Sequence, residues 1–135
     1  MIEKRFEAVA SNFEMAQAFV DELLVSHGCP ESVKFEIDLA IEEIFVNIAD
    51  YAYTPEVGDV VMKAIMSDDG MKLTLIFEDS GTPFDPLKKP DPDVTLSASE
   101  RELGGLGIFL VKETMDDMFY EYKEGKNQLT LVKGW

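Results

Sequence analysis

The apolar residues of two segments in the first half of the chain recur at the spacing of an α-helix. One segment covers residues 12–27, with Asn12 in position to cap its start, and the other covers residues 31–51, after Pro30. In the second segment isoleucine and phenylalanine return every three or four residues, so one face is apolar and is expected to pack on another layer. A shorter helix is expected at residues 106–115.

Five other segments have the residue pattern of β-strands. They are residues 2–9, 59–66, 71–78, 117–123 and 127–133. Asp68-Asp69-Gly70 is a hairpin signal between the second and the third, and a second hairpin turns around residues 124–127. Hairpins clustered with helices favour an α+β fold, a two-layer α/β sandwich in which helices cover one face of a mainly antiparallel sheet.

Length and composition narrow the possible functions. A chain of 135 residues suits one domain, residues 1–135, with one core. The formal net charge of −15 argues against nucleic acid as a partner, because phosphate binding needs clustered Lys and Arg, and it favours a basic protein partner. One Cys and one His exclude an internal disulfide and are too few for a zinc site. Without an apolar run of membrane length or a signal-peptide core, we expect a cytoplasmic protein that does not bind a membrane.

The second predicted helix also has a polar face, which carries Glu36, Glu43, Asn47 and Asp50. On this helix alone, an ordinary solvated face is the preferred interpretation. Glu43 and Asn47 are four residues apart and therefore adjacent in space. An asparagine oxygen can ligate Mg²⁺ together with phosphate oxygens, and a carboxylate beside it can accept a proton from a hydroxyl group or a water.

Two further motifs each allow a structural and a functional interpretation. Asp79 and Gly81 follow a predicted strand, where they either form an ordinary turn or serve a nucleotide: Asp79 would accept a hydrogen bond from the exocyclic amine of adenine, and Gly81 would let the backbone pass close to the base. The run Gly104-Gly105-Leu106-Gly107 opens the third helix, either as a hinge or as a close backbone approach to phosphate at a helix N-terminus.

The three motifs, in this order along the chain, resemble those of the GHKL ATPases. Within that superfamily the chain is similar to the bacterial anti-sigma-factor serine kinases. The resemblance is carried by residues 43–53, residues 79–86, residues 104–111 and Met115-Asp116-Asp117, and it covers almost the whole chain. Tyr51 stands where many relatives carry His, and Pro83 stands where other branches carry Gly; both are compatible with the anti-sigma branch.

The resemblance implies ATP and Mg²⁺ as cofactors, and a mobile lid at residues 82–105. It implies Glu43 as the base that activates the hydroxyl of a protein serine, Asn47 as the Mg²⁺ ligand and Asp79 as the residue that recognises adenine. The other nucleotide contacts expected are Asp50, Gly81, Pro83, Arg101, Gly104, Gly105, Leu106 and Gly107. It also implies a homodimer that sequesters a sigma factor and phosphorylates a small antagonist, the anti-anti-sigma protein.

The distribution of basic residues leaves the chemistry open. No Lys or Arg lies within the motifs; Arg101 is the nearest candidate for the γ-phosphate, and Lys88 and Lys89 lie further back in the expected lid. Phosphoryl transfer usually uses such a charge besides Mg²⁺. The chain is therefore either an ATP-dependent serine/threonine-protein kinase, which Glu43 favours, or a non-catalytic ATP-binding regulatory module or a slow ATPase of the same fold.

Overall fold

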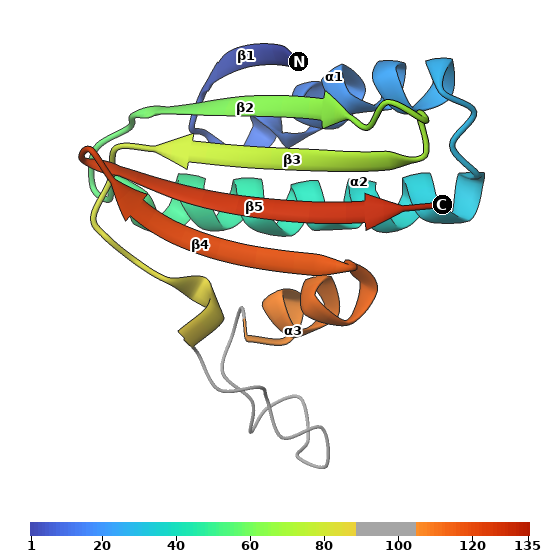
Figure 1. The fold of residues 1–135 in the computed structure, drawn as a ribbon. Coiled ribbons are helices and arrows are strands. Elements are labelled where there is room, and N and C mark those ends of the chain that lie inside the picture. The colour runs from blue at the N-terminus through green and yellow to red at the C-terminus, as the bar shows by residue number, and fades with distance from the viewer. Residues whose placement is uncertain (89–104) are drawn as a thin grey trace.

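One layer of the fold is a five-stranded antiparallel sheet, seen in a computed structural model that describes residues 1–88 and 105–135 (Figure 1). The strand order is β1-β2-β3-β5-β4, and each neighbouring pair is antiparallel. The strands are β1 (Ile2–Glu7), β2 (Asp59–Met66), β3 (Lys72–Asp79), β4 (Asp117–Lys123) and β5 (Lys126–Gly134). This order places β3 and β5, which are far apart in sequence, side by side at the centre.

Three α-helices within the described residues form the second layer and cover one face of the sheet (Figure 1). They are α1 (Phe13–Ser26), α2 (Glu31–Asn47) and α3 (Gly105–Thr114). Short turns of helix add η1 (Ala10–Asn12), η2 (Ile48–Ala52) and η3 (Pro86–Lys88). The predicted α+β fold, a two-layer sandwich with an antiparallel sheet, is confirmed, and the element bounds differ from the sequence predictions by a few residues.

The core lies between the helices and the sheet, as the residue pattern requires. Alternate residues of the central strands face the helices and are buried, as are the apolar residues of α2 at helical spacing. Burial of apolar surface stabilises a fold by about 25 cal/mol per Å². The largest fully buried side chains are Phe45, Phe77, Leu24, Ile37, Ile41, Met62, Leu73 and Leu75. This packing fixes α2 across the sheet, with its C-terminal end near the end of β3.

Two local details differ from the sequence predictions. Asn12 does occupy the N-cap position of α1, but its side chain makes no cap hydrogen bond; the amide instead donates to the Glu7 carbonyl at 2.9 Å, because η1 has already turned the chain before the helix begins. The second hairpin turn is also shorter than expected. Glu124 and Gly125 alone form it, both with positive φ (56° and 77°), and Lys126 already pairs with β4.

The end of α2 differs in a way that shapes the site. The predicted helix continues to residue 51, but the α-helical geometry ends at Asn47 and η2 follows as a π-helical turn. The Ala52 carbonyl at its end accepts a hydrogen bond from the Thr82 N–H at 2.9 Å. The C-terminal end of α2 is thereby bound to the turn that follows β3. Among the described residues, no helix has the length and apolar character needed to cross a membrane.

Candidate nucleotide site

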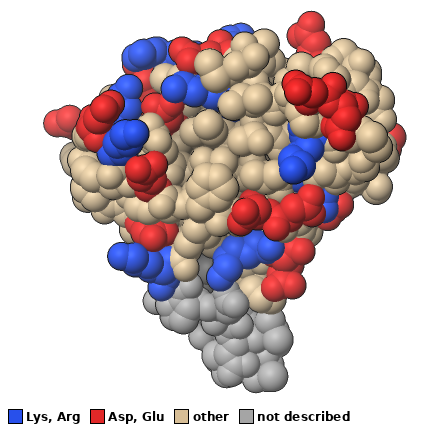
Figure 2. All heavy atoms as spheres, viewed as in Figure 1, with Lys and Arg blue, Asp and Glu red and all other residues tan. Residues whose placement is uncertain are grey.

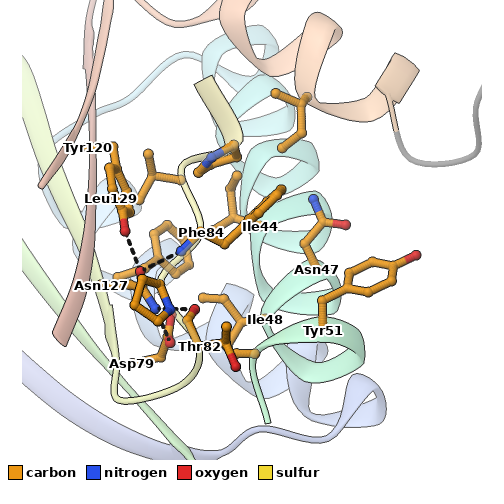
Figure 3. Close-up of a pocket in the computed structure, with 15 residues that line it drawn as sticks. Ile44, Asn47, Ile48, Tyr51, Asp79, Thr82, Phe84, Tyr120, Asn127 and Leu129 are labelled. Carbon is orange, nitrogen blue, oxygen red and sulfur yellow. Dashed lines mark hydrogen bonds between the residues drawn. The ribbon is translucent and has the colours of Figure 1, made fainter. Parts of the chain in front are cut away.

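A cavity of about 300 Å³ opens between α2 with η2, the turn after β3, the start of α3 and strands β4 and β5 (Figure 3). Its walls are largely apolar, formed by Ile44, Ile48, Phe77, Pro83, Phe84, Ile108 and Leu129. Figure 3 shows Asp79 and Asn127 on the sheet side and Asn47 and Tyr51 on the helix side. An apolar cleft with a few fixed polar groups suits a flat heteroaromatic base, which needs stacking area and a small number of hydrogen bonds.

Asp79 ends β3 and is 7% exposed. Two hydrogen bonds reach its carboxylate from the described residues, from the Gly81 N–H and from Asn127 Nδ2, each at 2.9 Å, and both end on Oδ1. Burial raises the pKa of Asp79, whereas these two hydrogen bonds favour its charged form and lower it. Both bonds leave the second oxygen, Oδ2, as an acceptor for a ligand of the cavity that Asp79 lines.

The turn after β3 is held against the end of α2 by backbone contacts. A Cβ on Gly81 would lie 2.3 Å from the Ala52 carbonyl oxygen, so only glycine permits this approach. The Tyr53 hydroxyl donates to the Asp59 carbonyl at 2.6 Å and accepts from the Ser80 N–H at 2.8 Å. Gly81 itself does not line the cavity, and the structure gives it a packing role besides the predicted approach to the base.

Glu43 and Asn47 lie at the other end of the site, beside α3. Asn47 lines the cavity, and Glu43 lies one helical turn before it. A Cβ on Gly107 would lie 1.9 Å from Glu43 Oε2, so the first turn of α3 rests directly on this carboxylate. Burial, and then the neighbouring Glu42, raise the pKa of Glu43. A carboxyl group with a raised pKa is better matched to accepting a proton near neutral pH than an ordinary glutamate.

Comparison with known families identifies the domain. The profile of the histidine kinase-like ATPase domain matches residues 6–133. The chain belongs to this family. Membership implies that this ATPase domain binds ATP, and the largely apolar cavity that Asp79 helps to line is a suitable place for the nucleotide.

The curated relatives of this ATPase domain include bacterial protein kinases. The chain is 26% identical over 100 residues to the serine/threonine-protein kinase BtrW of Bordetella bronchiseptica, covering 74% of this chain and 70% of that protein. It is 30% identical over 95 residues to the serine-protein kinase RsbW of Listeria monocytogenes (67% and 59% covered), and 29% identical over 98 residues to RsbW of Bacillus cereus (70% and 60%). The matched part thus spans about 60% of the RsbW kinases.

The other sequence-predicted residues of the ATPase domain fall into four groups. Pro83 lines the cavity. Asp50 does not; it lies exposed on η2, where its carbonyl accepts a hydrogen bond from the Thr54 hydroxyl. Gly105 and Leu106 open α3. Arg101, Gly104 and residues 89–104 of the expected lid lie outside the described residues, so their predicted roles remain predictions.

Mg²⁺ coordination by this ATPase domain would depend on few protein atoms. The described residues contain no group of three or more His, Cys, Asp or Glu side chains suited to a metal ion. Mg²⁺ often keeps waters and takes one or two protein ligands besides substrate phosphates. Asn47, at the cavity wall, fits that mode of binding when phosphate oxygens supply the remaining ligands.

The sequence patterns missed three residues of the site: Tyr53, Tyr120 and Asn127. Tyr120 and Asn127 line the cavity, and Tyr53 clamps the turn below it. Each acts through partners from another element, so local motifs do not indicate them. The only available signal was the polar Asn127 at the start of an otherwise apolar alternating strand.

Proposed function

We propose that this domain binds ATP with Mg²⁺ and transfers the terminal phosphoryl group to a serine or threonine of a partner protein, as an anti-sigma regulatory kinase. In this proposal Asp79 recognises the adenine amine, Asn47 ligates Mg²⁺, and the N–H groups at the start of α3 face the phosphates. The observation that carries the proposal is Glu43, a part-buried carboxyl group held against the first turn of α3 and one helical turn from Asn47.

The placement of α3 supports a phosphate site where its N-terminus meets Glu43. A helix N-terminus offers N–H groups without helical partners and a positive partial charge, both of which favour anions. Gly105 and Gly107 flank Leu106 in the first turn, and glycine adds no side chain beside the backbone N–H groups at those two positions. When bound, Mg²⁺ would neutralise negative charge on the phosphates. Glu43 would accept the proton of the attacking hydroxyl group.

The partners follow from the kinase relatives and from the charge. We infer a sigma factor, an anti-anti-sigma protein as the phosphorylated substrate, and a homodimer. The likeness to RsbW and BtrW supports a protein substrate with serine or threonine as the acceptor. The net charge of −15 supports a partner with a basic surface.

A second candidate function rests on the charges around the cavity. Among the described residues, no lysine or arginine lines it. Phosphoryl transfer usually places such a cation near the γ-phosphate. This observation favours a regulatory module that binds ATP without transferring phosphate, or a slow ATPase in which water replaces the hydroxyl group.

The variant Glu43→Gln separates the two functions. It keeps the size of the side chain but removes the proton acceptor, so we expect phosphorylation to fall about 10²–10⁴-fold while ATP affinity stays near the wild-type value. The measurement is transfer of label from γ-labelled ATP, with Mg²⁺, to proteins in an extract of the source cells, together with calorimetry of ATP binding.

The matched control is Glu36→Gln on the same helix. Glu36 Oε1 lies 3.9 Å from Lys133 Nζ in an ion pair, and Glu36 does not line the cavity. The Glu36→Gln variant should label the same protein at the wild-type rate. Equal labelling by Glu43→Gln and the wild type would mean that the base is another group, and ATP binding without any labelled protein would favour the regulatory module.

A further inference from the structure

Asn127 has a buried side chain that links β5 to β3, to the turn after β3 and to β4. It is the second residue of β5, and its Nδ2 donates to Asp79 Oδ1 at 2.9 Å and to the Thr82 carbonyl at 3.0 Å. Its Oδ1 accepts from the Phe84 N–H at 3.1 Å and from the Tyr120 hydroxyl. Figure 3 shows these bonds converging on Asn127 at the sheet side of the cavity.

We propose that Asn127 is the positioning residue of the nucleotide site, which fixes the Asp79 carboxylate as an acceptor for the base and holds the chain from Thr82 to Phe84 at the same point. This inference rests on the proposed nucleotide function for its ligand, but not for its geometry. Asn127 acts through Asp79, whose Oδ1 it occupies while Oδ2 remains for the exocyclic amine.

The chemistry of the side chain explains why asparagine suits this position. A carboxamide provides two donor hydrogens and one acceptor oxygen in a plane. Here the donors serve two acceptors, Asp79 and the Thr82 carbonyl, and the oxygen serves two donors from the loop and from β4. An aspartate would offer no donor to Asp79, and an apolar residue would leave these buried polar groups without partners, which is unfavourable.

The register of the sheet brings Asn127 to this position. It pairs directly with Asp79 across the β3–β5 ladder and with Tyr122 across the β4–β5 ladder. The two-residue turn at Glu124-Gly125 sets the second register. Because side chains alternate between the faces of a sheet, a slip of one residue would turn Asn127 to the opposite face.

The contact has an electrostatic consequence that can be measured. Burial raises the pKa of Asp79, and the Asn127 hydrogen bond lowers it. The other ionisable groups that interact with this array are Tyr53 after η2, Tyr120 and Tyr122 on β4, Asp59 on β2 and Asp85 in the turn. Burial raises the pKa of Tyr53 and of Tyr120, so these two side chains remain neutral while Asp79 titrates. Loss of the amide should therefore shift the titration of Asp79 upward.

The first test does not require nucleotide. The ¹³C signal of the Asp79 carboxyl group is followed against pH in the nucleotide-free wild type and in Asn127→Leu, with folding verified by circular dichroism. We expect the midpoint to rise by about one pH unit in the variant. The control is Thr130→Val, which alters a buried residue of the same strand on the opposite sheet face. Equal midpoints in all three proteins would overturn the proposal.

The second test measures ATP binding and uses a different variant, so it remains possible if Asn127→Leu does not fold. Asn127→Asp keeps the size of the side chain but places two carboxyl groups together, which share a proton only at low pH. We expect its ATP affinity, relative to the wild type, to fall about tenfold or more between pH 5 and pH 8. A constant ratio would overturn the positioning role. If the wild type binds no ATP, the proposed function fails, while the Asp79 titration still decides the role of Asn127.

Discussion

The two carboxyl groups of the site, Asp79 and Glu43, are held by different contacts. Burial raises the pKa of Asp79, and hydrogen bonds from a turn and a neighbouring strand, which favour its charged form, oppose this rise. For Glu43 the causes that act on the pKa, burial and the neighbouring Glu42, both raise it. Environments that treat two carboxyl groups differently allow different roles. Asp79 is suited to accept a hydrogen bond, and Glu43 to accept a proton.

The first prediction at the residue scale concerns the base. Asp79→Asn replaces one acceptor face with a donor, which would meet the donor amine of adenine. We expect ATP binding to weaken by about 1–3 kcal/mol, the usual effect of an unpaired buried polar group, and the wild type to prefer ATP over GTP. Calorimetry with both nucleotides tests this, with Asp59→Asn, an exposed carboxyl group, as control. Equal affinities of the wild type for GTP and ATP would remove the assignment of Asp79.

A second residue-scale prediction concerns Gly107. In Gly107→Ala the new methyl group would meet Glu43 Oε2, so either the carboxylate or α3 must move. We expect a loss of stability of about 1–3 kcal/mol, as for other overpacked positions, together with loss of phosphorylation. Urea unfolding gives the first quantity and labelled ATP the second.

A double variant shows whether the Gly107 effect arises from this contact. Glu43→Ala removes the carboxylate that the new methyl group meets. The stability loss of Gly107→Ala should therefore be smaller in the Glu43→Ala background than in the wild type, because residues in contact are not additive. Additive losses would place the strain elsewhere.

Among the elements, α1 and α2 are joined by an acidic pair with one lysine. Lys34 Nζ lies 3.7 Å from Asp21 Oδ2 and 3.4 Å from Asp38 Oδ2. The Oδ1 atoms of both aspartates are buried without a hydrogen-bond partner among the described residues when both groups are ionised. Burial, and then the hydrogen bond and charge of Asp21, raise the pKa of Asp38 to about 7. A proton shared between the two carboxyl groups gives both oxygens a partner.

This pair predicts a pH dependence of stability at the element scale. The pKa of Asp38 is higher in the folded than in the unfolded chain, so folding retains a proton, and this contribution is full below about pH 4 and is lost as the pH rises through about 7. Between pH 5 and pH 8 the free energy of unfolding should therefore decrease more in the wild type than in Asp38→Asn. Urea unfolding at several pH values measures the difference.

The control for the acidic pair is Asp59→Asn, which alters an exposed ion pair with Arg5. Its pH profile should run parallel to that of the wild type, because exposed ion pairs contribute little. Parallel profiles for Asp38→Asn and the wild type would show that the two aspartates do not share a proton.

At the scale of the whole molecule, the net charge is strongly acidic, but acidic and basic side chains are not separated from each other on the sheet face. Figure 2 shows acidic and basic side chains interspersed around an uncharged centre on the sheet side. With a net charge of −15, the long-range field still attracts basic proteins. We expect the association rate with the proposed partner, a sigma factor, to fall as ionic strength rises. Stopped-flow measurements at several salt concentrations test this, and a rate that does not change would exclude electrostatic steering.

The sequence predicted the elements because their signals are local. Helical and alternating periodicity located the three helices and five strands to within a few residues, and Asp68-Asp69-Gly70 located a turn in which Gly70 indeed has positive φ (71°). The order of the polar motifs indicated the family, which the profile match confirms. These features depend on neighbours in the chain, so the sequence alone contains them.

Only the tertiary structure decided which residues complete the site. Asn127 meets Asp79, 48 residues earlier, because β5 pairs with β3, and the Tyr53 hydroxyl reaches Ser80 because η2 ends against the turn after β3. It likewise gave Gly81 and Gly107 their neighbours, Ala52 and Glu43, which no local pattern names. The physical reason is that side-chain periodicity specifies which face a residue occupies, whereas register and packing between distant segments specify what that face contacts.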